Sequence, residues 1–153
     1  MDLSGSERAL SLAMQRLLEE HLFWATMYTR WQYTDANWQV NKQAIFGALP
    51  PLQDMLADSW RHLIKQKIYG HGMGRHTPEE IFELGNQDID ALSAYLGDKK
   101  YFLGNKPTTL DASAFGFLIN TFGCSIESPI NLKNSVRADN ARLSQAGYGF
   151  GHI

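Results

Sequence analysis

The chain has 153 residues, of which 44% are hydrophobic and 20% charged, and its formal net charge is −2. This length is typical of one domain, and a chain of this size buries enough surface to fold without a metal or a disulfide. The nearly neutral charge gives no general attraction to nucleic acid, so nucleic-acid binding is not expected. Cys124 is the single cysteine, which excludes an internal disulfide and a Cys-x-x-Cys site.

Neither a secretory signal nor a membrane span is expected from the sequence. The N-terminal segment carries a charge every few residues, and it lacks a basic region followed by an apolar one. No stretch approaches the roughly 18 to 20 uninterrupted apolar residues that a membrane helix needs. The single cysteine fits a reducing compartment, so the cytoplasm is the expected location.

Apolar residues recur at three- and four-residue steps, which predicts helices throughout and an all-α fold. The first helix is expected from about Ser6 to Tyr33, with Ser4 or Ser6 as the N-cap. A second, shorter helix is expected to follow Thr34 or Asp35. Along the first helix one apolar stripe contains Leu10, Ala13, Met14, Leu17, Trp24, Tyr28 and Trp31.

Two prolines, Pro50 and Pro51, are expected to open a third helix, since proline is favoured in the first helical turn. Glycines from Gly70 onward end it. The expected buried stripe of this third helix consists of Leu52, Met55, Leu56, Trp60, Leu63, Ile64 and Ile68.

The fourth helix has the clearest start signal, with Thr77 as cap, Pro78 at the first position and Glu80 closing a capping box. Gly97 is its expected end. A fifth helix, from about Thr109 to Phe122, is apolar on all sides and is therefore expected to be central and surrounded by protein.

A weaker last helix is expected at residues 132–145, followed by an irregular tail at about 146–153. The chain contains no repeat and no linker, so residues 1–153 are expected to form a single helical domain.

Two stretches carry a family resemblance. The segment 104–111, Gly-Asn-Lys-Pro-Thr-Thr-Leu-Asp, resembles the N-capping box that opens the buried central helix of the glutathione transferase C-terminal domain. In that box Thr108 caps the helix and the Asp111 carboxylate returns a hydrogen bond to the backbone of Thr108. The segments 70–80, 96–100 and 35–38 together resemble the metaxin-like, or failed-axon-connections-like, branch of the superfamily.

The resemblance implies a glutathione transferase C-terminal-like helical bundle around a buried central helix. It also implies a two-domain parent in which a thioredoxin-like half binds and activates glutathione, while the helical half lines the electrophile site. No thioredoxin-like pattern occurs in these residues, so a thioredoxin-like partner is expected in cis or in trans, and glutathione is implied only for the complete parent. A homodimer is a further option, since the family often dimerises.

Five residues of the first helix are candidates for the substrate pocket: Trp24, Tyr28, Trp31, Arg30 and His21. The resemblance places this helix beside the cleft between the two domains. The competing interpretation assigns the aromatic stripe to the core and makes His21 a core histidine bonded to a backbone carbonyl.

No catalytic residue and no metal site is predicted. The glycine-rich segment 70–76 follows no strand and lacks the spacing of a dinucleotide-binding loop, so it is interpreted as an ordered corner between helices. His71 and His76 lack acidic or cysteine partners for a metal. Cys124 has no histidine placed to activate it and is expected to be structural.

The sequence therefore favours a glutathione transferase-like domain that is inactive on its own. The alternative functions are a non-catalytic, metaxin-like binding or assembly domain and, more weakly supported, a small-ligand carrier that uses the aromatic stripe.

Overall fold

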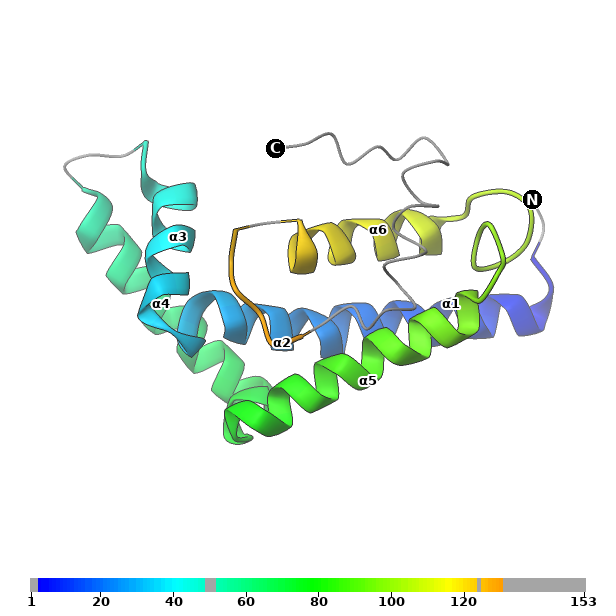
Figure 1. Cartoon of the computed structure of the whole chain (residues 1–153), viewed down its shortest axis with the longest axis horizontal. Helices are drawn as coiled ribbons and strands as arrows, with labels where there is room; N and C mark the ends of the chain where they lie inside the picture. Colours follow the sequence, from blue (N-terminus) through cyan, green and yellow to red (C-terminus); the bar gives the residue numbers. More distant parts are fainter. Residues whose placement is uncertain (1–2, 49–51, 124, 131–153) are drawn as a thin grey trace.

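The computed structural model describes residues 3–48, 52–123 and 125–130. Figure 1 shows helices arranged along a long central rod, and in the described residues the only β feature is an isolated bridge between Tyr101 and Gly104. The expected all-α fold is confirmed. The helical elements are α1 (Gly5–Leu17), η1 (Leu18–Leu22), α2 (Phe23–Tyr28), η2 (Thr29–Tyr33), α3 (Asp35–Phe46), α4 (Gln53–His71), η3 (Met73–Arg75), α5 (Pro78–Leu96) and α6 (Thr109–Phe122).

The rod is the predicted first helix and consists of α1, η1, α2 and η2 in unbroken succession. It begins in a capping box in which the Glu7 carboxylate accepts hydrogen bonds from the backbone N–H and the hydroxyl of Ser4, both at 2.7 Å. The two η segments are π-helical, which the apolar pattern did not predict. Each π turn contains one residue more than an α-helical turn. The side chains that follow it are therefore rotated about the helix axis relative to their positions in an unbroken α-helix.

The arm, as we call α3 and α4 together, lies at the η2 end of the rod, and α4 runs back past this end to contact α2 as well as η2 (Figure 1). The Arg61 side chain holds it there. Its Nε donates to the Trp31 carbonyl at 3.0 Å, and its Nη2 lies 3.2 Å from an Asp35 carboxylate oxygen. Its guanidinium also lies over the Trp38 ring. The side-chain amide of buried Asn37 donates hydrogen bonds to the backbone carbonyls of Thr29 in η2 and of Glu127. Segment 35–38 therefore connects the arm to the rod and to the segment that follows α6.

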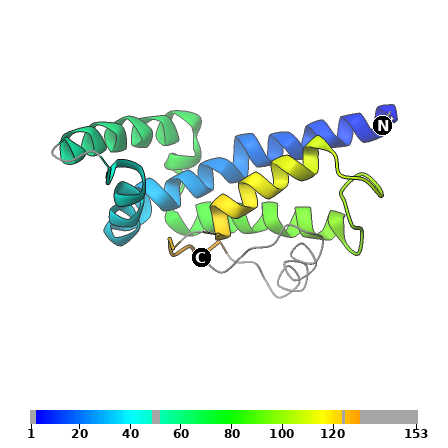
Figure 2. The ribbon, with the colours of Figure 1, turned by 90° about the horizontal axis from the view of Figure 1, so that it is seen from above.

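A tight corner connects the arm to α5. Gly72 has φ 118°, a conformation that side chains with a Cβ rarely adopt, and η3 then turns the chain. Thr77 and Glu80 form the predicted capping box, with Pro78 in the first helical position. The ordered corner predicted for segment 70–76 is therefore confirmed. Figure 2 shows α5 running beside the rod along much of its length.

The predicted N-capping box at the start of α6 is confirmed. Asp111 Oδ2 accepts hydrogen bonds from the Thr108 backbone N–H at 2.7 Å and from the Thr108 hydroxyl at 2.6 Å, in a capping box. Asp111 Oδ1 accepts a further bond from the Phe102 backbone N–H at 2.8 Å. One carboxylate thus satisfies donors of the helix start and of the preceding loop.

The helix α6 packs on the rod along one face. Its buried residues are Leu110, Ala114 and Thr121, and the Thr121 hydroxyl lies 3.0 Å from that of Thr26 in α2. Because the Thr121 hydroxyl donates to the Phe117 carbonyl, Thr26 is the donor in this pair. Residues 115–119 are only partly buried. Within the described part of the chain, the helix is therefore covered by the rod on one side and is not enclosed on all sides as expected.

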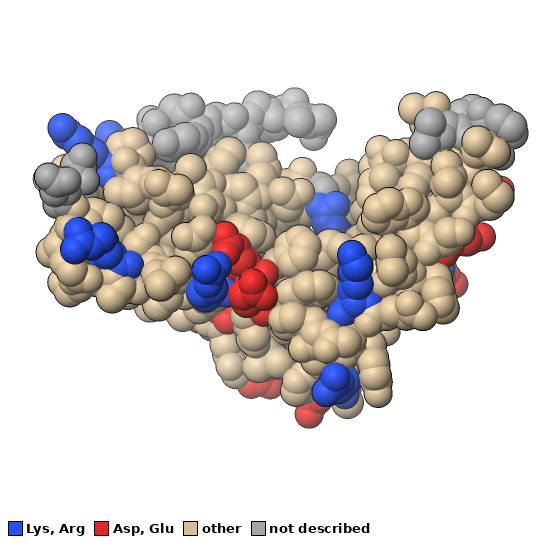
Figure 3. All heavy atoms as spheres, turned by 180° about the vertical axis from the view of Figure 1, so that it is seen from behind, with Lys and Arg blue, Asp and Glu red and all other residues tan. Residues whose placement is uncertain are grey.

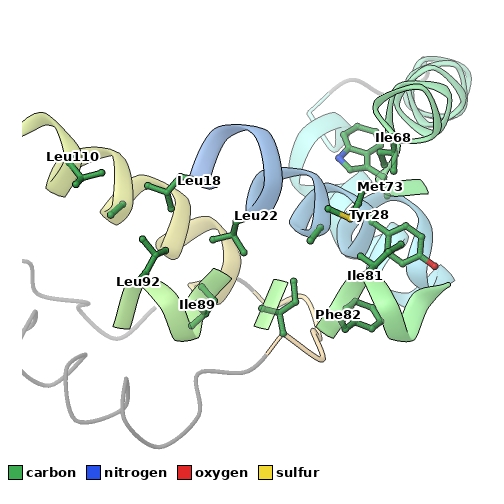
Figure 4. Packing of buried hydrophobic residues seen from close by; sticks show 14 of the residues in the cluster. Leu18, Leu22, Tyr28, Ile68, Met73, Ile81, Phe82, Ile89, Leu92 and Leu110 are labelled. Carbon is green, nitrogen blue, oxygen red and sulfur yellow. The ribbon is translucent and has the colours of Figure 1, made fainter. Parts of the chain in front are cut away.

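The core lies between the rod, α5, the corner and α6 (Figure 4). Its centre is apolar: the side chains of Leu18, Leu22, Ile68 and Ile81 are fully shielded from solvent. Burial of each such side chain contributes about 1.5–3 kcal/mol. No helix in the described part of the chain is both long and apolar enough to cross a membrane.

One sequence expectation is met only in part for α4. From the predicted buried stripe, Ile68 is buried and Leu56 and Ile64 pack against the core, whereas Leu52, Met55, Trp60 and Leu63 are exposed. The helix faces the core with the side that carries Ala57, Ile64 and Ile68. Three further expectations fall outside the described residues: the prolines that open α4, the last helix at 132–145 and the tail at 146–153.

Candidate functional site

All five pocket candidates lie in the part of the rod that contains the two π-helical segments. His21 is in η1, Trp24 and Tyr28 are in α2, and Arg30 and Trp31 are in η2. Single π turns inside α-helices occur frequently at functional sites. Because each π turn contains an extra residue, the five side chains point in different directions around the rod and contact different neighbours.

His21 pairs with Asp88 of α5. Its Nδ1 lies 2.6 Å from Asp88 Oδ2, and the side chains are 39% and 10% exposed, respectively. Burial raises the pKa of the Asp88 carboxyl, while the hydrogen bond and charge of His21 act in the lowering direction. His21 therefore has a side-chain partner and not the backbone carbonyl that the core interpretation assumed.

Trp24 belongs to a row of aromatic rings that crosses the rod. Its indole stacks on the His71 imidazole, with centroids 4.5 Å apart and planes at 16°. Phe23, its neighbour in α2, meets Trp24 edge to face at 5.4 Å and Phe117 of α6 at 6.1 Å. We call His71, Trp24, Phe23 and Phe117 the aromatic row. Since none of the four is buried, the row offers an apolar surface that reaches from α4 to α6.

Arg30 bonds the end of α6. Its guanidinium donates a hydrogen bond to the backbone carbonyl of Asn120 in the last turn of α6. A cation there offsets the partial negative charge of the helix C-terminus. Arg30 thereby ties η2 to α6.

Tyr28 and Trp31 are core residues, with 7% and 6% of their surface exposed. The Tyr28 ring packs against Phe82, and Trp31 packs against Trp38. Burial raises the pKa of the Tyr28 phenol, and Tyr33 and Glu79 add to this effect. For these two residues the structure favours the core interpretation over the pocket interpretation.

A cavity of about 550 Å³ lies elsewhere, at the first half of α5. It is lined by Tyr33, Pro78, Glu79, Phe82, Glu83, Asn86, Gln87, Asp90 and Pro129, which include none of the five candidates. Among the described residues, no group of three or more His, Cys, Asp or Glu side chains could hold a metal ion. Cys124 lies outside the described residues.

Sequence reasoning missed three residues of this region. Asp88 lies on the buried stripe of α5, three residues after Gly85 and four before Leu92, and a carboxylate in such a position signals a buried partner. Phe23 and Phe117 gave no usable signal, because their contact joins residues that are far apart in the chain.

Comparisons with known proteins agree with this architecture. Residues 85–145 match the family model described as glutathione S-transferase, C-terminal domain. The chain is 39% identical over 120 residues to the isoprene-epoxide–glutathione S-transferase of Rhodococcus sp., a match covering 76% of this chain and 50% of that enzyme. It is 36% identical over 126 residues to Failed axon connections of Drosophila melanogaster, covering 76% of this chain and 30% of that protein.

A further relative is human Metaxin-2, 30% identical over 113 residues, which cover 73% of this chain and 43% of that protein. The matched region thus spans half or less of the length of these relatives. No solved structure matches the chain. The fold, the capped apolar helix and these matches define an all-helical domain of the glutathione transferase type. The chain belongs to the glutathione S-transferase superfamily as its C-terminal domain, in the branch that includes Failed axon connections and the metaxins.

Proposed function

We propose that this domain lines the electrophile site of a glutathione transferase and works with a thioredoxin-like domain, in cis or in trans, that binds and activates glutathione. The observation that carries the proposal is the 39% identity to the Rhodococcus transferase over 120 residues. The aromatic row supplies the apolar wall. The cytoplasm is the proposed location.

The chemistry divides between the two domains. The thioredoxin-like domain stabilises the glutathione thiolate, which is the nucleophile. In the reaction with an epoxide, the sulfur forms a bond to a ring carbon, the carbon–oxygen bond breaks, and the oxygen takes a proton. This domain excludes water and positions the apolar electrophile, which lowers the barrier by fixing the reacting atoms near each other.

A chimera tests the proposal. The part of the Rhodococcus transferase that precedes its matched region is fused to this chain, and conjugation of glutathione to isoprene epoxide is measured. We expect turnover, with Trp24→Ala and Phe117→Ala each raising the KM for the epoxide about tenfold, as expected for the loss of about 1.4 kcal/mol of apolar contact. The KM for glutathione stays unchanged, because glutathione binds mainly to the other domain.

The matched control is Trp60→Ala, which removes an exposed indole of α4 outside the aromatic row. It should leave both KM values unchanged. A chimera that binds immobilised glutathione and has a native circular dichroism spectrum, yet shows no turnover, would count against the electrophile site.

The second candidate is a non-catalytic, metaxin-like binding or assembly domain. It is favoured by the similarity to Failed axon connections and to the metaxins. In this case the aromatic row binds a protein partner in place of a small electrophile. A chimera that folds and binds glutathione without turnover is the outcome expected from this alternative.

A further inference from the structure

The cavity of about 550 Å³ beside the first half of α5 has the size of a small-molecule site. After Pro78, its α5 residues follow one another at steps of three and one: Glu79, Phe82, Glu83, Asn86, Gln87 and Asp90. Side chains at this spacing share one face of a helix, so the cavity extends along about three turns of α5. Tyr33 and Pro129 complete its wall. The cavity and the aromatic row have no residue in common.

The wall of this cavity is acidic. It carries three carboxylates, Glu79, Glu83 and Asp90, and no Lys, Arg or His. Glu79 and Glu83 form no ion pair with any residue that the structure describes. The face of the molecule in Figure 3 carries Lys and Arg beside Asp and Glu, so a wall with carboxylates alone is a local feature of the cavity. A hollow lined by one sign of charge concentrates ligands of the opposite sign.

Two aromatic rings also line the cavity. The rings of Tyr33 and Phe82 meet edge to face, with centroids 4.7 Å apart and planes at 79°. Tyr33 is 37% exposed, so its ring has surface available to a ligand. The Tyr28 ring packs against Phe82 from the core. Burial raises the pKa of Tyr28, and Tyr33 and Glu79 raise it further, so the charge of Glu79 acts close to the aromatic pair.

We propose that this cavity binds a small organic cation that carries an alkylammonium or quaternary ammonium group. The ammonium group packs on the Tyr33 ring, whose face attracts cations, and Glu79 and Glu83 supply the opposite charge. A bare metal ion fits less well, because no three His, Cys, Asp or Glu side chains in the described residues are grouped to hold one. The proposal does not depend on the electrophile site.

NMR titration of the full chain with choline is the first test. We expect the side-chain amide signals of Asn86 and Gln87 to shift together and to saturate, because both residues line the cavity. The dissociation constant for choline is expected on the order of 1 mM, since a ligand of so few atoms makes few contacts. Dimethylbutanol, the neutral isostere with carbon in place of the ammonium nitrogen, should cause much smaller shifts at the same concentration.

Two kinds of substitution separate the charge from the ring. Glu79→Gln and Glu83→Gln should each weaken choline binding about threefold, and the double variant about tenfold, as expected for partly screened charges at the surface. Tyr33→Leu keeps an apolar wall but removes the ring face. It should weaken choline binding about threefold and leave the response to dimethylbutanol unchanged.

Glu20→Gln is the matched control, because Glu20 is an exposed residue of η1 outside the cavity, and it should leave choline binding unchanged. Thermal unfolding of each variant should match the wild type, since the substituted side chains are exposed. The absence of any shift at choline concentrations well above the expected dissociation constant would overturn the proposal. Equal responses to choline and to dimethylbutanol, or choline binding that the double variant retains in full, would overturn it as well.

Discussion

The pair formed by His21 and Asp88 places a carboxyl group among apolar side chains. Asp88 neighbours Ile89 in α5, and its carboxylate reaches across to the first π-helical segment of the rod. Burial favours the protonated form, and the nearby imidazole favours the ionised form; burial is the stronger effect, so the pKa is raised. The pair joins α5 to the rod, and its ionisation is therefore linked to stability.

This linkage predicts the pH dependence of an Asp88→Asn variant. Because the pKa of Asp88 is higher in the folded state than its ordinary value of 3.8, folding favours the proton. The resulting stability is present below that value and is lost as the pH rises through the folded pKa. The difference in free energy of unfolding, Asp88→Asn minus wild type, should therefore increase from pH ~3 to ~5.

Urea denaturation at successive pH values measures this difference. Glu20→Gln is the control, since Glu20 is exposed on the same rod, and its difference from the wild type should stay nearly constant. A difference for Asp88→Asn that falls as the pH rises would show that the carboxyl has a lowered pKa in the folded state.

The capping box formed by Asp111 is the second feature that depends on single residues. Its carboxylate accepts three hydrogen bonds, two from Thr108 and one from Phe102. Asp111→Ala should reduce the free energy of unfolding by about 1–2 kcal/mol, because donors at the helix start and in the loop lose their acceptor. An unchanged denaturation midpoint would mean that water replaces the carboxylate at no cost.

Among the elements, α5 is closely packed at Gly85, chiefly against Ile130. A Cβ on Gly85 would lie 2.9 Å from Ile130 Cδ1 and 3.4 Å from the Ala25 Cβ. Gly85→Val should therefore destabilise the protein by about 1–3 kcal/mol through overpacking.

Gly116, inside α6, provides the contrast, because nothing lies within 4 Å of an added Cβ. Gly116→Ala should stabilise by about 0.5–1 kcal/mol through helix propensity alone. Urea midpoints of the two variants check both signs. Equal effects would show that the close approach of Ile130 to α5 does not limit side-chain size at position 85.

For the whole molecule, the proposed activity depends on a second domain. We expect no measurable conjugation of glutathione to a chloronitrobenzene by the purified 153-residue chain. The physical reason is that thiol activation in the superfamily is assigned to the thioredoxin-like half, and an apolar wall does not lower the pKa of a thiol. A spectrophotometric assay decides the matter, and appreciable turnover would contradict the division of roles proposed above.

The sequence by itself determined the features that depend on neighbouring residues. Local hydrogen bonding determines the capping boxes at Thr77 and Thr108. The 3.6-residue repeat of apolar side chains indicates the helices and their order along the chain. Tertiary structure decided which apolar side faces the core. It buried Ile68 of the predicted α4 stripe and left the first part of that stripe largely exposed. It also brought His21 to Asp88 and Phe23 to Phe117. Such contacts depend on how rotated helices meet in space, and the π turns that set this rotation leave no mark in the apolar pattern.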